Sequence, residues 1–189
     1  MTQTPVISNR IQAANILRLY VWELLLAHGL LDKITVQTEA GAVNLLPVIP
    51  IEDEPKVANS GKTYIIYGYG ENLAGDLNVV KNGAFSLRIV SDSTTEIGEI
   101  TTTISRALDD EDVSAQNVNS WSNEYMNGVF VGIRFTTLNV SYVSSPEPPD
   151  TEGGRGYGIM NVSYRYITHQ KAKRYNADSN NWEYWPEGE

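Results

Sequence analysis

Phosphate binding is the first chemistry that the residues suggest, because Ser60-Gly61-Lys62-Thr63 matches the end of a phosphate-binding loop. The full motif needs a glycine five positions before Gly61, where this chain has Lys56, and a helix after the loop. The following residues, Tyr64 to Tyr69, are strand formers instead. We therefore do not expect phosphate binding at this segment.

Other reactive residue types are scattered. Gly68-Tyr69-Gly70 lacks the third glycine of a dinucleotide fingerprint, since Leu73 occupies that place. The only histidines are His28 and His169, too few for a metal site. The acidic pair Asp109 and Asp110 has the residue types of glycoside hydrolysis, but nothing else in the sequence supports that reaction. We expect no catalytic residues, no cofactor and no metal.

Composition favours one acidic globular domain. The 189 residues suit a single domain, and 41% of them are hydrophobic, which is enough for a core. The net charge of −9 disfavours a nucleic-acid-binding surface, which needs clustered Lys and Arg. The absence of cysteine excludes disulfides and thiolate metal sites, and fits a reducing cytosol. The most apolar stretch, Ile16 to Leu31, contains Arg18, Glu23 and His28, so we expect no signal peptide or membrane span.

Two helices are predicted. Apolar residues recur at helical spacing from Asn9 to His28, and their stripe is wide enough for burial in the core or against a neighbouring subunit. The second helix, Thr94 to Leu108, has one isoleucine-rich face that must pack on a sheet. Ser93 and Glu96 form a capping-box pattern at its start. The acidic run Asp109 to Asp112 is interpreted as the start of a solvated loop.

Alternating residues predict the strands. The main runs are Tyr64 to Tyr69, Ala84 to Val90, Val129 to Val140 and Tyr157 to Thr168. Further strand residues are expected at Asp76 to Val80, a turn at Asn82-Gly83 and an edge strand or extended segment at Leu45 to Ile51, which contains Pro47 and Pro50. The fold class is therefore α+β: a mixed, mainly antiparallel sheet with two main helices packed on it. A long loop, Ser144 to Gly156, separates the last two strands.

The periodic pattern stops after His169, which divides the chain into a domain of residues 1–169 and a C-terminal tail of residues 170–189. The tail begins with the basic run Lys171 to Arg174 and carries Trp182, Tyr184 and Trp185 close together. Aromatic residues are favoured anchors at interfaces. We expect the tail to lie along a neighbouring subunit or partner, with folding back onto its own domain as the alternative.

The order of these elements resembles the tail-terminator (tail-completion) proteins of tailed bacteriophages. The resemblance covers residues 9–169 and includes a strand such as Gly83 to Val90, one helix, and closing strands at Val129 to Tyr142 and Gly158 to Ile167. It implies an α/β sandwich and a hexameric ring that caps the tail tube, in a virion assembled in the host cytoplasm. The C-terminal tail and the proline-containing segment 45–55 depart from that family pattern.

The resemblance also implies partners: other copies of the chain, the tail-tube protein and the head connector or neck proteins. Genome DNA would pass through an acidic lumen without specific binding, and no membrane is involved. The wide apolar helix and exposed sheet edges are expected to serve the ring. The partner-contact candidates are Pro146, Glu147, Pro148, Pro149, Asp150, Arg155, Trp182, Tyr184 and Trp185.

Other functions remain open from the sequence. A head-completion (stopper) protein or a tail-tube protein is the structural alternative. A ligand-binding module or an enzyme of unrecognised type is the alternative of another class.

Overall fold

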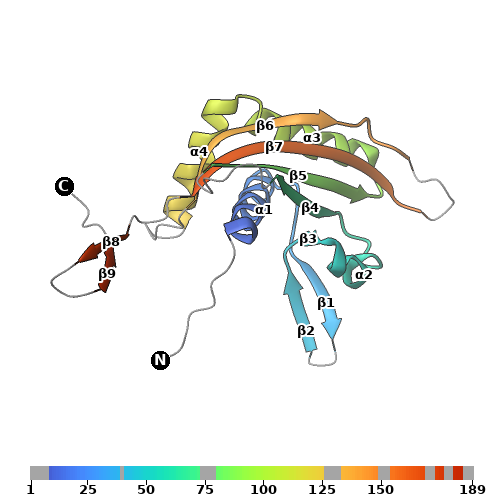
Figure 1. The fold of residues 1–189 in the computed structure, drawn as a ribbon. Helices are drawn as coiled ribbons and strands as arrows, with labels where there is room; N and C mark the ends of the chain where they lie inside the picture. Colours follow the sequence, from blue (N-terminus) through green and yellow to red (C-terminus); the bar gives the residue numbers. More distant parts are fainter. Residues whose placement is uncertain are drawn as a thin grey trace.

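The computed structural model describes residues 9–38, 41–72, 80–125, 133–148, 154–168, 173–176 and 181–184, and the structural statements below refer to these residues. The helices are α1 (Asn9–Ala27), the short 3-10 helix η1 (Ile51–Asp53), α2 (Glu54–Val57), α3 (Thr94–Ala107) and α4 (Glu111–Tyr125). The strands are β1 (Ile34–Thr38), β2 (Gly41–Leu45), β3 (Val48–Pro50), β4 (Tyr64–Asn72), β5 (Val80–Ser91), β6 (Ile133–Val143), β7 (Gly156–Thr168), β8 (Lys173–Asn176) and β9 (Asn181–Tyr184). The predicted α+β class is confirmed (Figure 1).

The main sheet has five strands in the order β3-β4-β5-β7-β6. Only β3 and β4 run parallel, and the other neighbours are antiparallel. The proline-containing segment does form an edge strand, β3, as its composition predicts. The predicted turn at Asn82-Gly83 is wrong, because both residues lie within β5 and pair with β4 and β7. The expected strand at Asp76 to Val80 lies outside the described residues except for Val80, the first residue of β5.

One face of this sheet carries the hydrophobic core. Phe85, Leu87 and Ile89 of β5 alternate with exposed residues and are almost completely buried, as their spacing predicts. Helices α1, α3 and α4 cover this face and contribute to the same cluster. The core places most of the apolar stripe of α1 inside the domain, including Trp22, whereas Leu26 stays exposed.

The opposite face is covered at one end only. A second, smaller cluster joins the β1 residue Ile34 and the α2 residue Val57 to the near ends of β3, β4 and β5. Strands β1 and β2 continue beyond this cluster as a two-stranded hairpin that projects from the body (Figure 1). All five β2 residues are exposed or half-buried. This hairpin was not predicted from the sequence.

Helix α4 corrects the expectation of two main helices. Asp109 and Asp110 are exposed in a short bend between α3 and α4, whereas the helix itself begins at Glu111, so the acidic run leads into a third long helix and not into a loop. Asp110 accepts a hydrogen bond from the Val113 amide at 3.0 Å through its side chain, which caps the helix. Acidic residues are unfavourable at the end of α3 but favourable at the beginning of α4, where the helix dipole is positive.

The start of α3 confirms one half of the capping-box prediction. The Ser93 side chain accepts a hydrogen bond from the Glu96 amide. The Glu96 carboxylate does not return to Ser93; it accepts from the hydroxyls of Ser91 at 2.5 Å and Thr63 at 2.7 Å. These hydrogen bonds connect the start of β4 and the end of β5 to the first turn of α3. They also satisfy the hydroxyl of Ser91, which is buried.

Replacing Gly83 with alanine is expected to destabilise the domain by about 1–3 kcal/mol through overpacking. Gly83 lies opposite Tyr164 of β7, and an added Cβ would overlap the tyrosine ring, 2.7 Å from its Cε2 atom. Gly68→Ala is the matched control, because an added Cβ there meets nothing within 4 Å. Thermal unfolding of both variants checks this, and equal stabilities would contradict the close approach.

Candidate interaction surfaces

The residues with possible phosphate or acid-base chemistry are not brought together. Ser60 to Thr63 precede β4, as expected, and the Ser60 hydroxyl accepts from the Lys62 amide at 3.2 Å. His28 follows α1, and its Nδ1 lies 2.8 Å from the Leu24 carbonyl oxygen. Among the described residues, no three His, Asp or Glu side chains are grouped so that they could hold a metal ion. His169 lies outside these residues.

Buried tyrosines are not activated by their surroundings. Burial raises the pKa of Tyr20, Tyr64 and Tyr67, and the Glu54 carboxylate adds to this effect at Tyr64. A raised pKa keeps each phenol neutral at physiological pH, the opposite of what a tyrosinate nucleophile needs.

None of the described helices has the length and hydropathy needed to cross a membrane.

Polar side chains occupy both edges of the main sheet. Asn119 of α4 uses its carboxamide like a neighbouring strand: its nitrogen donates to the Phe135 carbonyl at 2.8 Å, and its oxygen accepts from the Phe135 amide at 2.9 Å. The Leu108 carbonyl accepts from Val140 further along β6. At the opposite edge, Arg18 Nε donates to the Val48 carbonyl of β3 at 2.7 Å. The expected exposed sheet edges are therefore partly blocked against added strands.

Asn119→Ala is expected to lower the free energy of unfolding by about 1–3 kcal/mol, because it leaves two backbone groups of β6 without their partners. The same variant should aggregate more readily through the uncovered edge. Asn123→Ala, at an exposed position one turn later on the same helix, should be close to neutral. Denaturant unfolding and light scattering measure both effects, and an Asn119 variant as stable as the control would contradict this role.

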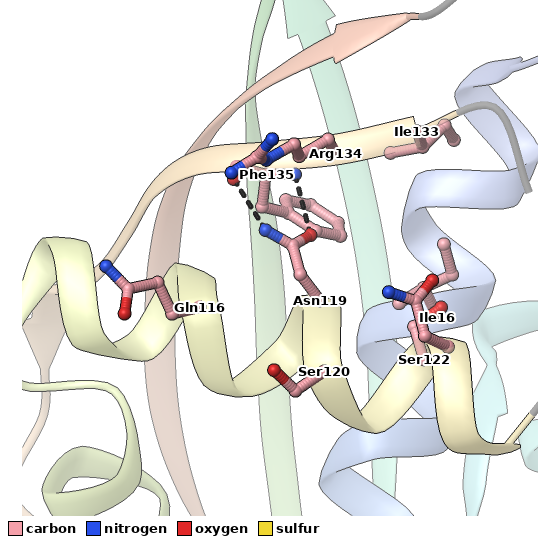
Figure 2. A pocket seen from close by; sticks show the side chains of 9 residues that line it. Ile16, Gln116, Asn119, Ser120, Ser122, Ile133, Arg134 and Phe135 are labelled. Carbon is pink, nitrogen blue, oxygen red and sulfur yellow. Dashed lines mark hydrogen bonds between the residues drawn. The ribbon is translucent and has the colours of Figure 1, made fainter. Parts of the chain in front are cut away.

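A polar cavity lies beside this contact, between α4, β6 and α1 (Figure 2). Its volume is about 470 Å³. Amide and hydroxyl side chains of α4 line it, together with Ile16 and the β6 residues Ile133, Arg134 and Phe135. The side-chain amide of Asn119 is hydrogen-bonded to β6, and the Ser122 hydroxyl is buried without a hydrogen-bond partner among the described residues. No convergent set of acid, base or nucleophile appears among these residues.

The predicted contact loop is attached to the sheet where it is described. Glu147 and Tyr157 exchange two backbone hydrogen bonds, and the Tyr157 hydroxyl donates to the Glu147 carboxylate. Arg155 donates to Asp92 at 2.6 Å and to the Lys62 carbonyl at 2.8 Å, and its guanidinium lies over the Tyr64 ring. Arg155 is thus held within its own domain. Pro146 and Pro148 are at the described base of the loop, while Pro149 and Asp150 lie outside the described residues.

The C-terminal region contains a hairpin that the sequence analysis did not predict. Strands β8 and β9 pair with each other in a separate two-stranded sheet, with Trp182 opposite Tyr175. Tyr184 ends β9, and Trp185 lies outside the described residues. Figure 1 shows this hairpin apart from the main sheet and its helices. A lone two-stranded hairpin is only marginally stable in water.

Comparison with models of protein families gave no match, and comparison with curated proteins gave none of significant similarity.

Proposed function

We propose that this chain is a structural subunit of a phage neck ring, which terminates the tail tube and joins it to the head connector. The observation that carries the proposal is the element order: a long first helix, a five-stranded, mainly antiparallel sheet, and helices packed on one face. The first helix, the strands and α3 support the tail-terminator resemblance of residues 9–169, whereas α4 is a second helix where that resemblance has one. Two hairpins outside the main sheet, β1–β2 and β8–β9, give the subunit additional segments for contacts with neighbours.

The ring is proposed to be hexameric and to form at the end of the tail tube, which can template it. Heterologous contacts close into a ring when the rotation between subunits permits. The net charge of −9 suits a lumen through which DNA passes without adhering, since phosphates are repelled. The partners would be copies of this chain, the tail-tube protein and the head connector proteins, in a virion.

Depletion of this chain during particle production tests the proposal. The expected result is full heads and separate tails, with tails of abnormal length or frayed ends. A stopper protein would instead leave tails normal and heads leaking DNA, and a tail-tube protein would leave no tails. Normal infectious particles without the chain would contradict all three structural functions.

A further inference from the structure

The face of the main sheet opposite the helices carries mostly small and polar residues along β4, β5 and β7, whose long strands are curved (Figure 1). The strand register places Gly68, Ser86 and Asn161 in one row across β4, β5 and β7. Gly70, Ala84 and Ser163 form the next row. These small residues are exposed or half-buried, and the second hydrophobic cluster begins in the next row on the side of Gly68, at Ile66, which pairs with Arg88. We call these two rows, with Arg88 and Arg165, the open face.

Nothing among the described residues requires glycine at two positions of the open face. Gly68 and Gly70 are not among the residues with a positive φ, and a Cβ added to either meets nothing within 4 Å. Glycine in a strand costs about 0.5–1 kcal/mol relative to alanine. Glycine within a strand often marks a place where another backbone approaches closely. The missing side chains therefore point to a contact outside the domain.

The charge of the open face is opposite to that of the whole chain. Strands β5, β6 and β7 contain no Asp or Glu, although the sequence has 23 acidic residues. Arg88 and Arg165 are exposed on this face, and the described residues pair neither with a carboxylate. The Arg88 guanidinium lies over the Tyr157 ring, at 5.5 Å from its centroid. A partner with an acidic surface would complement these two charges.

The chain itself carries such a surface on its helical side. Asp109, Asp110 and Asp112 are exposed where α3 ends and α4 begins, which we call the acidic corner. The α3 and α4 helices pack on the sheet face opposite the open face. The acidic corner of one copy can therefore contact the open face of a second copy, while the open face of the first copy stays available for a third. Such front-to-back contacts are heterologous, which is the type that generates rings.

We propose that the open face is the docking surface for the acidic corner of a second copy of this chain. This inference rests on the proposed ring and identifies its subunit contact. The glycines let the corner approach the backbone of β4, while Arg88 and Arg165 supply the opposing charge. Because the paired charges are at the surface, self-association should weaken as salt is added.

Two single-sided variants test the contact. Gly68→Thr places a branched side chain on the open face, where the isolated domain has room for it and a strand favours it. Asp109→Lys with Asp112→Lys reverses the acidic corner and leaves the capping residue Asp110 in place. Sedimentation velocity of the full chain over a range of concentrations measures self-association. Each variant should self-associate at least about tenfold more weakly than the wild type, with Gly68→Thr melting at the same or a higher temperature.

Mixing the two variants gives the decisive measurement. The Gly68→Thr variant retains an intact acidic corner, and the Asp109→Lys, Asp112→Lys variant retains an intact open face. Together they should form a one-to-one dimer that does not extend to larger assemblies. A wild-type chain that stays monomeric at its highest soluble concentration, or a mixture without dimer, would overturn the proposal. Arg-dependent binding of short DNA in place of self-association would assign the face to nucleic acid and overturn it too.

The outcomes separate this contact from the neck function. Gly68→Thr chains that still form wild-type rings would overturn the docking surface and leave a ring built on other contacts. Correct one-to-one docking in a protein that particles do not need would overturn the neck function and leave the docking surface in place.

Discussion

Phe85→Ala is expected to lower the free energy of unfolding by about 3–5 kcal/mol, a large part of the stability of an ordinary domain. Phe85 is 1% exposed and lies on the central strand β5, facing the helices. Its ring packs against Tyr67 of β4, with 5.5 Å between the ring centroids. Truncation would leave a cavity where the sheet meets its helical layer. Denaturant unfolding of the purified chain measures the effect.

The next residue provides the matched control. Ser86 is exposed on the open face, so Ser86→Ala should change the stability by no more than about 0.5 kcal/mol. The contrast between the two neighbours tests which face of the sheet carries the core. Equal losses at both positions would mean that both faces are buried, and would contradict the layer arrangement described above.

The strongly periodic segments could be predicted from the sequence. The alternation around Phe85 identifies its strand and its buried side, and the isoleucines of α3 identify the face that packs on the sheet. Such patterns are reliable because regular spacing places the apolar residues on one side of the strand or helix, and that side packs into a single core. The same holds for Met160, Val162, Tyr164 and Tyr166 of β7, which are all buried.

Helix α4 could not be predicted in the same way, because its residues favour other local structures. It is rich in serine and asparagine, which compete for backbone hydrogen bonds and lower helix propensity. Its buried residues are few and small, including Ala115 and Val118. The sequence signal for this helix is Asp110, because aspartate is a preferred residue at helix N-termini. In the structure its side chain accepts a hydrogen bond from the Val113 amide. Tertiary packing against β6 supplies what the local sequence lacks.

The interaction surfaces depend on strand order, which local patterns do not contain. The open face exists because β5 lies between β4 and β7, so that Gly68, Ser86 and Asn161 become neighbours across three strands. The edge contact of Asn119 with Phe135 likewise requires α4 to lie along β6. Of the predicted contact residues, Arg155 and Glu147 bind within their own domain, while the aromatic residues of the C-terminal hairpin remain candidates for an external contact.

Replacing Trp182 and Trp185 together with alanine is expected to weaken attachment to the neck by about 30-fold or more, in line with aromatic hot spots worth about 2 kcal/mol. Trp182 belongs to β9, in a hairpin separate from the main sheet. The melting temperature of the isolated protein should therefore not change. Binding to purified tails, measured beside thermal melting, separates the two effects.

Ile51→Ala serves as the control for that experiment, because Ile51 is also a large exposed hydrophobic residue but lies in η1, away from the hairpin. It should leave both tail binding and melting unchanged. A lower melting temperature in the double tryptophan variant would show that the aromatic residues fold onto their own domain, and would contradict the external contact.

An image reconstruction of the particle neck tests the central claim most directly. The neck ring proposal predicts a closed, hexameric ring of this chain between the end of the tail tube and the head connector, with the acidic corner of each subunit against the open face of the next. A particle that contains a single copy of the chain, or none at this junction, would contradict the proposed function.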